Sequence, residues 1–135
     1  MFQYTIGFIG TGNMGAALVR AACKGIGPQQ VVVTNHTPAK AQALAKEVGC
    51  QVVLTNEEVV RQSKFIMLGV KPHILPEILR QIAPVVKECT DQGEEKILVS
   101  MAAGVTMESI YQHLNLPDRV PVLRIMPNTP AAIGK

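Results

Sequence analysis

The residues whose type and spacing could do chemistry begin with Gly10, Gly12 and Gly15, which follow a β-branched and aromatic run and precede a run of small helix formers. In this pattern Gly10 makes the turn, Gly12 lets the backbone approach a pyrophosphate, and Gly15 lets the helix lie against the strand. Unpaired N–H groups at the start of the helix favour negative charge. The stretch therefore predicts a dinucleotide site, although a tight turn in another α/β protein would share these glycines.

A second set of polar residues, Thr34-Asn35-His36-Thr37, ends the second predicted strand. NAD-selective folds place a carboxylate here, about 20 residues after the glycine turn, to bind the adenosine ribose. This stretch has no Asp or Glu. Asn35 and Thr37 can donate hydrogen bonds to a 2′-phosphate, and protonated His36 can add positive charge. The pattern favours NADP(H) over NAD(H); alternatively, Asn35 and Thr37 only cap a turn and a helix.

Apolar runs alternate with helical patterns, and these elements would hold the polar residues in place. The runs predict six strands, at Ile6–Ile9, Val31–Val33, Gln51–Leu54, Phe65–Leu68, Lys96–Ser100 and Val120–Met126. Such alternation is typical of a Rossmann-type, doubly wound, mainly parallel sheet with helices on both faces. Ligands bind such sheets beyond the carboxyl ends of the strands. Residues 1–135 are expected to form a single domain.

The predicted helices have recognisable ends. The first follows Gly15, and the others are a helix capped by Thr37 and ended by Gly49, a short one capped by Asn56, a longer one carrying Leu75 to Val86, and one capped by Thr106. Pro84 should kink or end the longer helix, because proline removes a backbone donor and clashes with the preceding turn. His73 would lie in the first turn of that helix, and His113 on the surface near a helix end.

Composition excludes several classes of protein. The chain has 135 residues, 47% hydrophobic and 17% charged, which suits one globular core. A net charge of +3 is too small and scattered for a nucleic-acid surface. No apolar run approaches the roughly 18 residues of a membrane span, so a cytoplasmic protein is expected. Cys23, Cys50 and Cys89 lack metal-ligand spacing and are expected to be small buried residues in a reducing compartment.

Five motifs resemble the N-terminal half of the pyrroline-5-carboxylate reductase family. They are Gly7–Gly15, Asn56–Val60, Leu68–His73, Ser100–Thr106 and Arg124–Pro130, and the match runs the length of the chain. The first motif is shared with many NADP-linked dehydrogenases. The Val-Lys-Pro, Ala-Ala-Gly-Val-Thr and Met-Pro-Asn-Thr-Pro sequences, in this order and spacing, are far more specific.

The resemblance implies a role for each matching position. Gly10, Gly12 and Gly15 with Thr11, Asn13 and Met14 would hold the pyrophosphate, and Asn56 would reach the adenosine. Asn35, His36 and Thr37 would bind the 2′-phosphate, where the family often has Arg or Ser at the central places. Val70, Lys71, Pro72, Ala102, Ala103 and Gly104 would border the nicotinamide, and the Met126–Thr129 loop, chiefly through Asn128, would close the pocket.

The implied activity is reduction of a cyclic imine, Δ1-pyrroline-5-carboxylate, to L-proline by NADPH. In this family the substrate and proton-donor contacts come largely from a C-terminal helical domain that also forms the homodimer. That domain is absent from these 135 residues. The chain is therefore expected to be the cofactor-binding half of a longer enzyme and poorly active alone. Its catalytic residues are unknown, and no metal is expected.

The sequence also allows three other interpretations of its function. The glycine motif also suits β-hydroxyacid and phosphogluconate dehydrogenases, whose catalytic lysine is expected later in a longer chain. A second interpretation is a non-catalytic NADP-sensing module whose partner responds to occupancy. A third is a Rossmann-like domain for another adenine nucleotide. The direction of the reaction, and competition between dinucleotides, would distinguish them.

Overall fold

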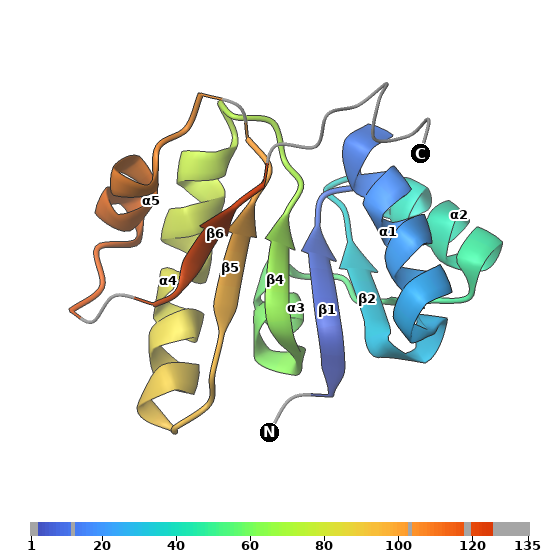
Figure 1. Cartoon of the computed structure of the whole chain (residues 1–135), viewed down its shortest axis with the longest axis horizontal. Coiled ribbons are helices and arrows are strands. Elements are labelled where there is room, and N and C mark those ends of the chain that lie inside the picture. Colours follow the sequence, from blue (N-terminus) through green and yellow to red (C-terminus); the bar gives the residue numbers. More distant parts are fainter. Residues whose placement is uncertain (1–2, 12, 103, 118–119, 126–135) are drawn as a thin grey trace.

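A computed structural model of the chain describes residues 3–11, 13–102, 104–117 and 120–125. Six strands in this part of the chain form one sheet in the order β3-β2-β1-β4-β5-β6 (Figure 1). Every neighbouring pair is parallel. The strands are β1 (Tyr4–Ile9), β2 (Val31–Thr34), β3 (Gln51–Val52), β4 (Ser63–Leu68), β5 (Ile97–Ser100) and β6 (Val122–Arg124). This is the Rossmann strand order, and it confirms the predicted fold class.

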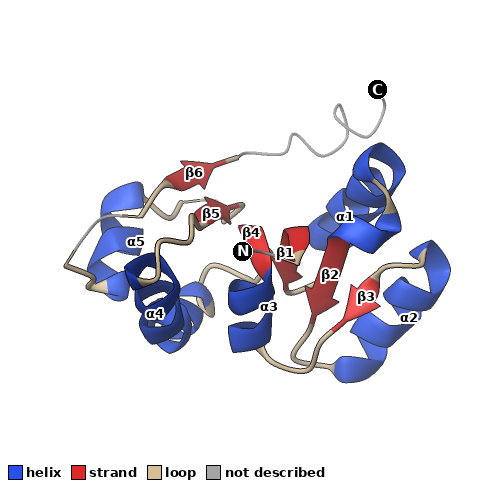
Figure 2. Cartoon of the chain, turned by 90° about the horizontal axis from the view of Figure 1, so that it is seen from below, coloured by secondary structure: helices blue, strands red, loops and turns tan. Residues whose placement is uncertain are grey.

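Helices cover both faces of the sheet, as a doubly wound topology requires. On one face lie α1 (Asn13–Ile26) and α2 (Pro38–Val48), and a short 3₁₀ turn at Pro28–Gln30 leads into β2. On the other face lie α3 (Asn56–Gln62), α4 (Leu75–Asp91) and α5 (Met107–Leu114) (Figure 2). The order of strands reverses between β1 and β4, so the crevice in which such folds bind ligands begins there.

Each face of the sheet has its own apolar core. Phe8 of β1 packs with Val19 of α1 and Leu44 of α2 on one side. On the other side, Ile66 of β4 packs with Leu79 of α4, in a cluster that extends to α5. Side chains alternate between faces along a strand, so β1 contributes to both cores. The central strands are thereby fixed, and so is the edge at which they end.

Three helix boundaries differ from those predicted, and the first is the start of α1, which begins at Asn13 rather than after Gly15. The N-cap of α3 is Thr55, not Asn56, because the Thr55 hydroxyl accepts a hydrogen bond of 3.1 Å from the backbone N–H of Glu58. Asn56 is instead the first helical residue, which leaves its side chain available for other contacts. Pro84 does not end α4, which continues to Asp91. Pro84 and Arg80 are both exposed, so the carbonyl that loses its N–H partner lies on the solvent side.

Three strands are shorter than expected, and the smallest difference is at β5, which begins at Ile97 rather than at Lys96. β3 pairs only at Gln51 and Val52, although the N–H of Val53 still donates to the carbonyl of Val33 at 3.0 Å. Leu54, predicted as its last residue, is 74% exposed and has left the sheet. β6 covers residues 122–124 rather than 120–126, and Met126 lies outside the described residues.

The three cysteines are buried and free, as predicted. Burial raises the pKa of Cys50 to about 11, and the neighbouring Cys23 thiol, whose pKa is also raised by burial, contributes to this shift. Both thiols are therefore protonated near neutral pH and pack as small apolar groups between β2, α1 and α2.

Candidate functional site: a nucleotide cavity at the carboxyl edge of the sheet

The turn after β1 is held in a shape that only glycine accommodates easily. Gly10 has a φ of 90°, and its N–H donates to the carbonyl of Thr34, at the end of β2, at 2.9 Å. A Cβ at Gly10 would lie 2.9 Å from the carbonyl carbon and oxygen of Gly69, which follows β4. Two glycines thus let the backbones leaving β1 and β4 meet at the switch point.

Close packing of α1 against this turn also depends on glycine. Gly15 is buried, and a Cβ there would lie 3.0 Å from the carbonyl oxygen of Gly10. The helix starts at Asn13, directly beside the turn, and its first turn contains no acidic residue. Its free N–H groups therefore form a positive helix end with no carboxylate of its own helix to compete with an anionic ligand.

Thr11 supplies an unpaired polar group in the same place. The residue is 8% exposed, and its hydroxyl is buried without a hydrogen-bond partner among the described residues. Its backbone N–H donates to the Asn35 side-chain oxygen at 3.4 Å, which ties the glycine turn to the residues after β2. Buried polar atoms without partners are rare and need an explanation. A phosphate oxygen is the kind of acceptor that this hydroxyl lacks.

A cavity of about 400 Å³ opens beside the turn. The structure brings five predicted residues to its wall, from the ends of β1, β2 and β4 and from α3: Gly10, Asn35, His36, Asn56 and Val70. Ligand pockets commonly have volumes of about 300–1,000 Å³, so the cavity can hold the adenosine part of a dinucleotide. Asn35 also donates from its side-chain nitrogen to the carbonyl of Thr37 at 3.3 Å, so the capping role and the binding role are compatible.

Other predicted residues lie outside this cavity wall. Thr37, Lys71 and Pro72 are exposed, and the carbonyl of Lys71 accepts from the N–H groups of Ile74 and Leu75. Ala102 is buried and its N–H donates to the Ser100 hydroxyl at 3.3 Å, and Gly104 is exposed with a φ of 78°. Gly12, Ala103 and Asn128 lie outside the described residues, as do the side chains of Asn13 and Met14. Their roles stay predictions.

The two histidines without an assigned role do not line the cavity. His73 is exposed in the turn before α4, two residues earlier than the helix itself. The Nδ1 atom of His113, in the last turn of α5, lies 3.2 Å from Nη1 of Arg80 on α4.

Part of the cavity wall was not predicted from the sequence. Ile78 and Gln81 line it from α4, Ile74 from the position just before that helix, and Leu54 from the segment before α3. Ile74, Ile78 and Gln81 have the spacing i, i+4, i+7 of one helix face, so a signal existed. It was hidden because the more apolar face of α4, which carries Leu75, Leu79 and Ile82, dominates the pattern.

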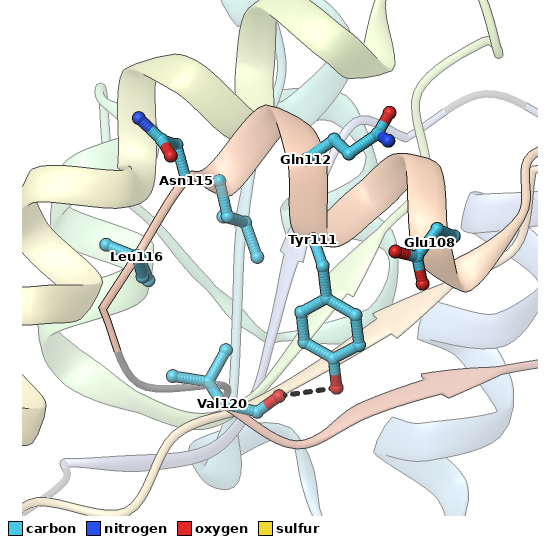
Figure 3. A pocket seen from close by; sticks show the side chains of 7 residues that line it. Glu108, Tyr111, Gln112, Asn115, Leu116 and Val120 are labelled. Atoms are coloured by element: carbon cyan, nitrogen blue, oxygen red, sulfur yellow. Dashed lines mark hydrogen bonds between the residues drawn. The ribbon is translucent and has the colours of Figure 1, made fainter.

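A second, smaller hollow lies beside the end of α5 (Figure 3). Its volume is about 180 Å³, and Tyr111 donates across it to the carbonyl of Val120 at 2.9 Å. Val120 precedes β6, so the hollow lies near the amino end of the edge strand. It is too small for a dinucleotide and is separate from the glycine turn.

Strand order, glycine turn and edge cavity together define the class of this protein: a Rossmann-type α/β domain with a candidate nucleotide site at the carboxyl edge of its sheet. Residues 5–104 match the model of a family described as NADP oxidoreductase, coenzyme F420-dependent. The chain belongs to this family.

The chain is also similar to individual enzymes, most of whose length lies beyond the matched region. The chain is 40% identical over 139 residues to pyrroline-5-carboxylate reductase 3 of Danio rerio, covering 98% of this chain and 44% of the relative. A pyrroline-5-carboxylate reductase from Coxiella burnetii has the same fold with a TM-score of 0.82 and 26% identity, over 97% of this chain and 46% of that one. A Plasmodium falciparum pyrroline carboxylate reductase, solved with NADP bound, has a TM-score of 0.76 at 22% identity, over 100% of this chain and 47% of that one.

These relatives confirm the resemblance seen in the sequence motifs. The chain spans about half the length of the curated relatives it matches, 46% and 44% for the enzymes of Pisum sativum and Danio rerio, and corresponds to their N-terminal part. In the described residues, no group of His, Cys, Asp or Glu could hold a metal ion. In that same part of the chain, no helix is long and apolar enough to cross a membrane.

Proposed function

We propose that this chain binds NADP(H) at the carboxyl edge of its sheet and serves as the cofactor-binding part of an imine reductase acting on Δ1-pyrroline-5-carboxylate. One observation carries the proposal. Within the described residues the buried Thr11 hydroxyl has no hydrogen-bond partner, and it lies in the glycine turn, beside a helix start without acidic residues. A dinucleotide pyrophosphate would satisfy this hydroxyl and the free N–H groups of α1 together.

The preference for NADP over NAD is part of the proposal. His36 and Asn35 line the cavity at the end of β2, where an NAD-selective fold would place a carboxylate. A 2′-phosphate would meet no like charge at these positions. The Plasmodium relative solved with NADP supports the same cofactor.

The proposed chemistry is that of the pyrroline-5-carboxylate reductases to which the chain is similar. The bound nicotinamide would supply a hydride to the imine carbon, and a proton would reach the ring nitrogen to give L-proline. This chain's part is to orient the cofactor through the glycine turn and the β2 end. Lys71, Pro72, Ala102, Ala103 and Gly104 would border the nicotinamide, and the Met126–Thr129 loop, chiefly through Asn128, would close the pocket. Val70 was predicted at the nicotinamide too, but it lies in the wall of the cavity assigned to the adenosine. A homodimeric or larger assembly and a cytoplasmic location belong to the same proposal.

Removal of the Thr11 hydroxyl tests the pyrophosphate site. Thr11→Val is expected to weaken NADPH binding about tenfold or more, since hydrogen bonds to charged groups contribute about 1.5–3 kcal/mol. Its melting temperature should not fall, because the lost hydroxyl has no hydrogen-bond partner within the part of the chain that the structure describes. Calorimetric titration checks the affinity. Thr5→Val, on β1 with its hydroxyl bonded to Gln30, is the control and should bind NADPH normally. Normal binding by Thr11→Val would contradict the site.

A change at His36 tests the 2′-phosphate site. His36→Arg is expected to raise the affinity ratio of NADPH to NADH several-fold, because Arg is always charged and can bind phosphate with two hydrogen bonds. Parallel titrations with the two cofactors measure this ratio. Unchanged relative affinities would overturn the assignment while leaving the dinucleotide site itself intact.

A further inference from the structure

Three polar side chains form a chain along one wall of the nucleotide cavity. Asn56, the first residue of α3, donates from Nδ2 to Oε1 of Gln81 on α4 at 2.8 Å. Gln81 in turn directs Nε2 at both carboxylate oxygens of Glu57, at 3.4 and 3.5 Å. All three residues line the cavity.

Glu57 determines which atoms donate and which accept in this hydrogen-bond network. An ionised carboxylate only accepts hydrogen bonds, so the side of Gln81 that faces it must be the NH₂ group. The oxygen of Gln81 is then the atom left for Asn56, and Asn56 must present its own NH₂ to it. The orientations of both amides thus follow from the charge of Glu57, which removes the ambiguity that amide groups otherwise have.

The polar side-chain atom of Asn56 that this network does not use is its oxygen, Oδ1. Within the described residues Oδ1 of Asn56 accepts no hydrogen bond, and it belongs to a half-buried residue of the cavity wall. Leu54, Ile74 and Ile78 are apolar neighbours in the same wall, and Val70 joins them. Apolar side chains suit the faces of a base, whereas the polar residues Asn35 and His36 at the end of β2 suit the ribose and its phosphate.

We infer that Gln81 is a positioning residue that makes the cavity selective for adenine, by holding the oxygen of Asn56 toward the 6-amino group of the base. Adenine offers a hydrogen-bond donor at this position, whereas hypoxanthine offers an acceptor. An acceptor held in place by the protein therefore forms a hydrogen bond with adenine. With hypoxanthine it would face another acceptor oxygen, and the two would repel each other. This inference rests on the proposed nucleotide function and adds the residue that reads the base.

The test compares two probes that differ only in the base: adenosine 2′,5′-bisphosphate and its inosine counterpart. The unaltered chain should bind the adenosine probe about five- to tenfold more tightly, the ratio expected for one hydrogen bond. Gln81→Lys should abolish or invert this preference. Lysine has only donors, so it would pair with Glu57 and donate to Oδ1 of Asn56, which turns the NH₂ of Asn56 toward the base.

The matched control exchanges the two partners, Glu57→Gln together with Gln81→Glu. The new carboxylate at position 81 still accepts the hydrogen bond from Asn56, and the new amide at position 57 donates to that carboxylate. The net charge of the protein and the orientation of Asn56 are therefore kept. This double variant should retain the preference for the adenosine probe. Gln81 is exposed, so the melting temperatures of all variants should match that of the parent. A purely structural role would change the affinities for both probes alike and leave their ratio constant.

The outcomes separate this inference from the proposed function. Equal affinities of the unaltered chain for the two probes, or an unchanged ratio in Gln81→Lys, would overturn the role of Gln81 and leave the cofactor site standing. Absence of binding to either probe by the folded chain would overturn the proposed function and the inference with it.

Discussion

Replacing Lys96 with methionine is expected to lower the free energy of unfolding by about 3–5 kcal/mol, the usual cost of breaking a buried charged network. The side chain of Lys96 is fully buried before β5. Its ammonium donates to the carbonyls of Ser63 at 2.7 Å and Arg61 at 3.0 Å, and lies 3.3 Å from a carboxylate oxygen of Glu94. Methionine fills the space but leaves these acceptors without their donor.

Denaturant unfolding followed by circular dichroism measures the effect. Lys64→Met is the matched control, because Lys64 forms a partly exposed pair with Glu95 at 3.2 Å. Such surface pairs contribute about 0–1 kcal/mol, so this variant should change little. A loss below about 1 kcal/mol for Lys96→Met would show that the buried ammonium does not hold α3 and β4 to β5.

The second large effect is expected at Gly7, in the middle of β1. A Cβ there would point at α3, lie 2.5 Å from Cγ1 of Val59 and come even nearer to the hydroxyl of Ser63. Val59 and Ser63 are both fully buried and have little room to move. Gly7→Ala should therefore destabilise the fold by about 1–3 kcal/mol, the usual cost of overpacking a core.

Gly25→Ala is the control for this substitution. Gly25 lies in the last turn of α1 with nothing within 4 Å of the added Cβ. Alanine at an exposed helical position is favoured over glycine by up to about 1 kcal/mol, so this variant should be as stable as the parent or more so. If both alanine variants unfold at the same denaturant concentration, the close contact of α3 with β1 is refuted.

The sequence was sufficient to predict the sheet, because its signals are local and repeated. Buried β-branched runs such as Val31–Val33 alternate with helices whose N-cap positions, Thr37 and Thr106, were predicted correctly. The Thr106 hydroxyl caps its helix, whereas the Thr37 side chain makes no capping hydrogen bond. Mistakes arose where neighbouring residues compete. Thr55 and Asn56 are both good N-caps, and the choice depends on the Glu58 N–H that Thr55 reaches. The helix α4 continues through Pro84 because the carbonyl that loses its N–H partner is exposed to solvent. This exposure is a property of the folded structure that the local sequence does not show.

The candidate site was predictable only in part, for a related reason. Gly10, Asn35 and Asn56 lie in motifs or at strand ends, which a sequence displays. Gln81 lies on the outer part of a long helix, and only the packing of α4 beside α3 brings it to Asn56. Lys96 reads as an ordinary first residue of a strand, and its complete burial depends on carbonyls more than 30 positions away.

The most direct test of the dinucleotide site is a fluorescence titration of this chain with NADPH and, in parallel, NADH, with circular dichroism to show that the chain is folded. We expect saturable binding of both cofactors, with NADPH bound clearly more tightly than NADH. Equal affinities would remove the phosphate role of Asn35 and His36. Failure of the folded chain to bind either cofactor would contradict the dinucleotide site at the glycine turn.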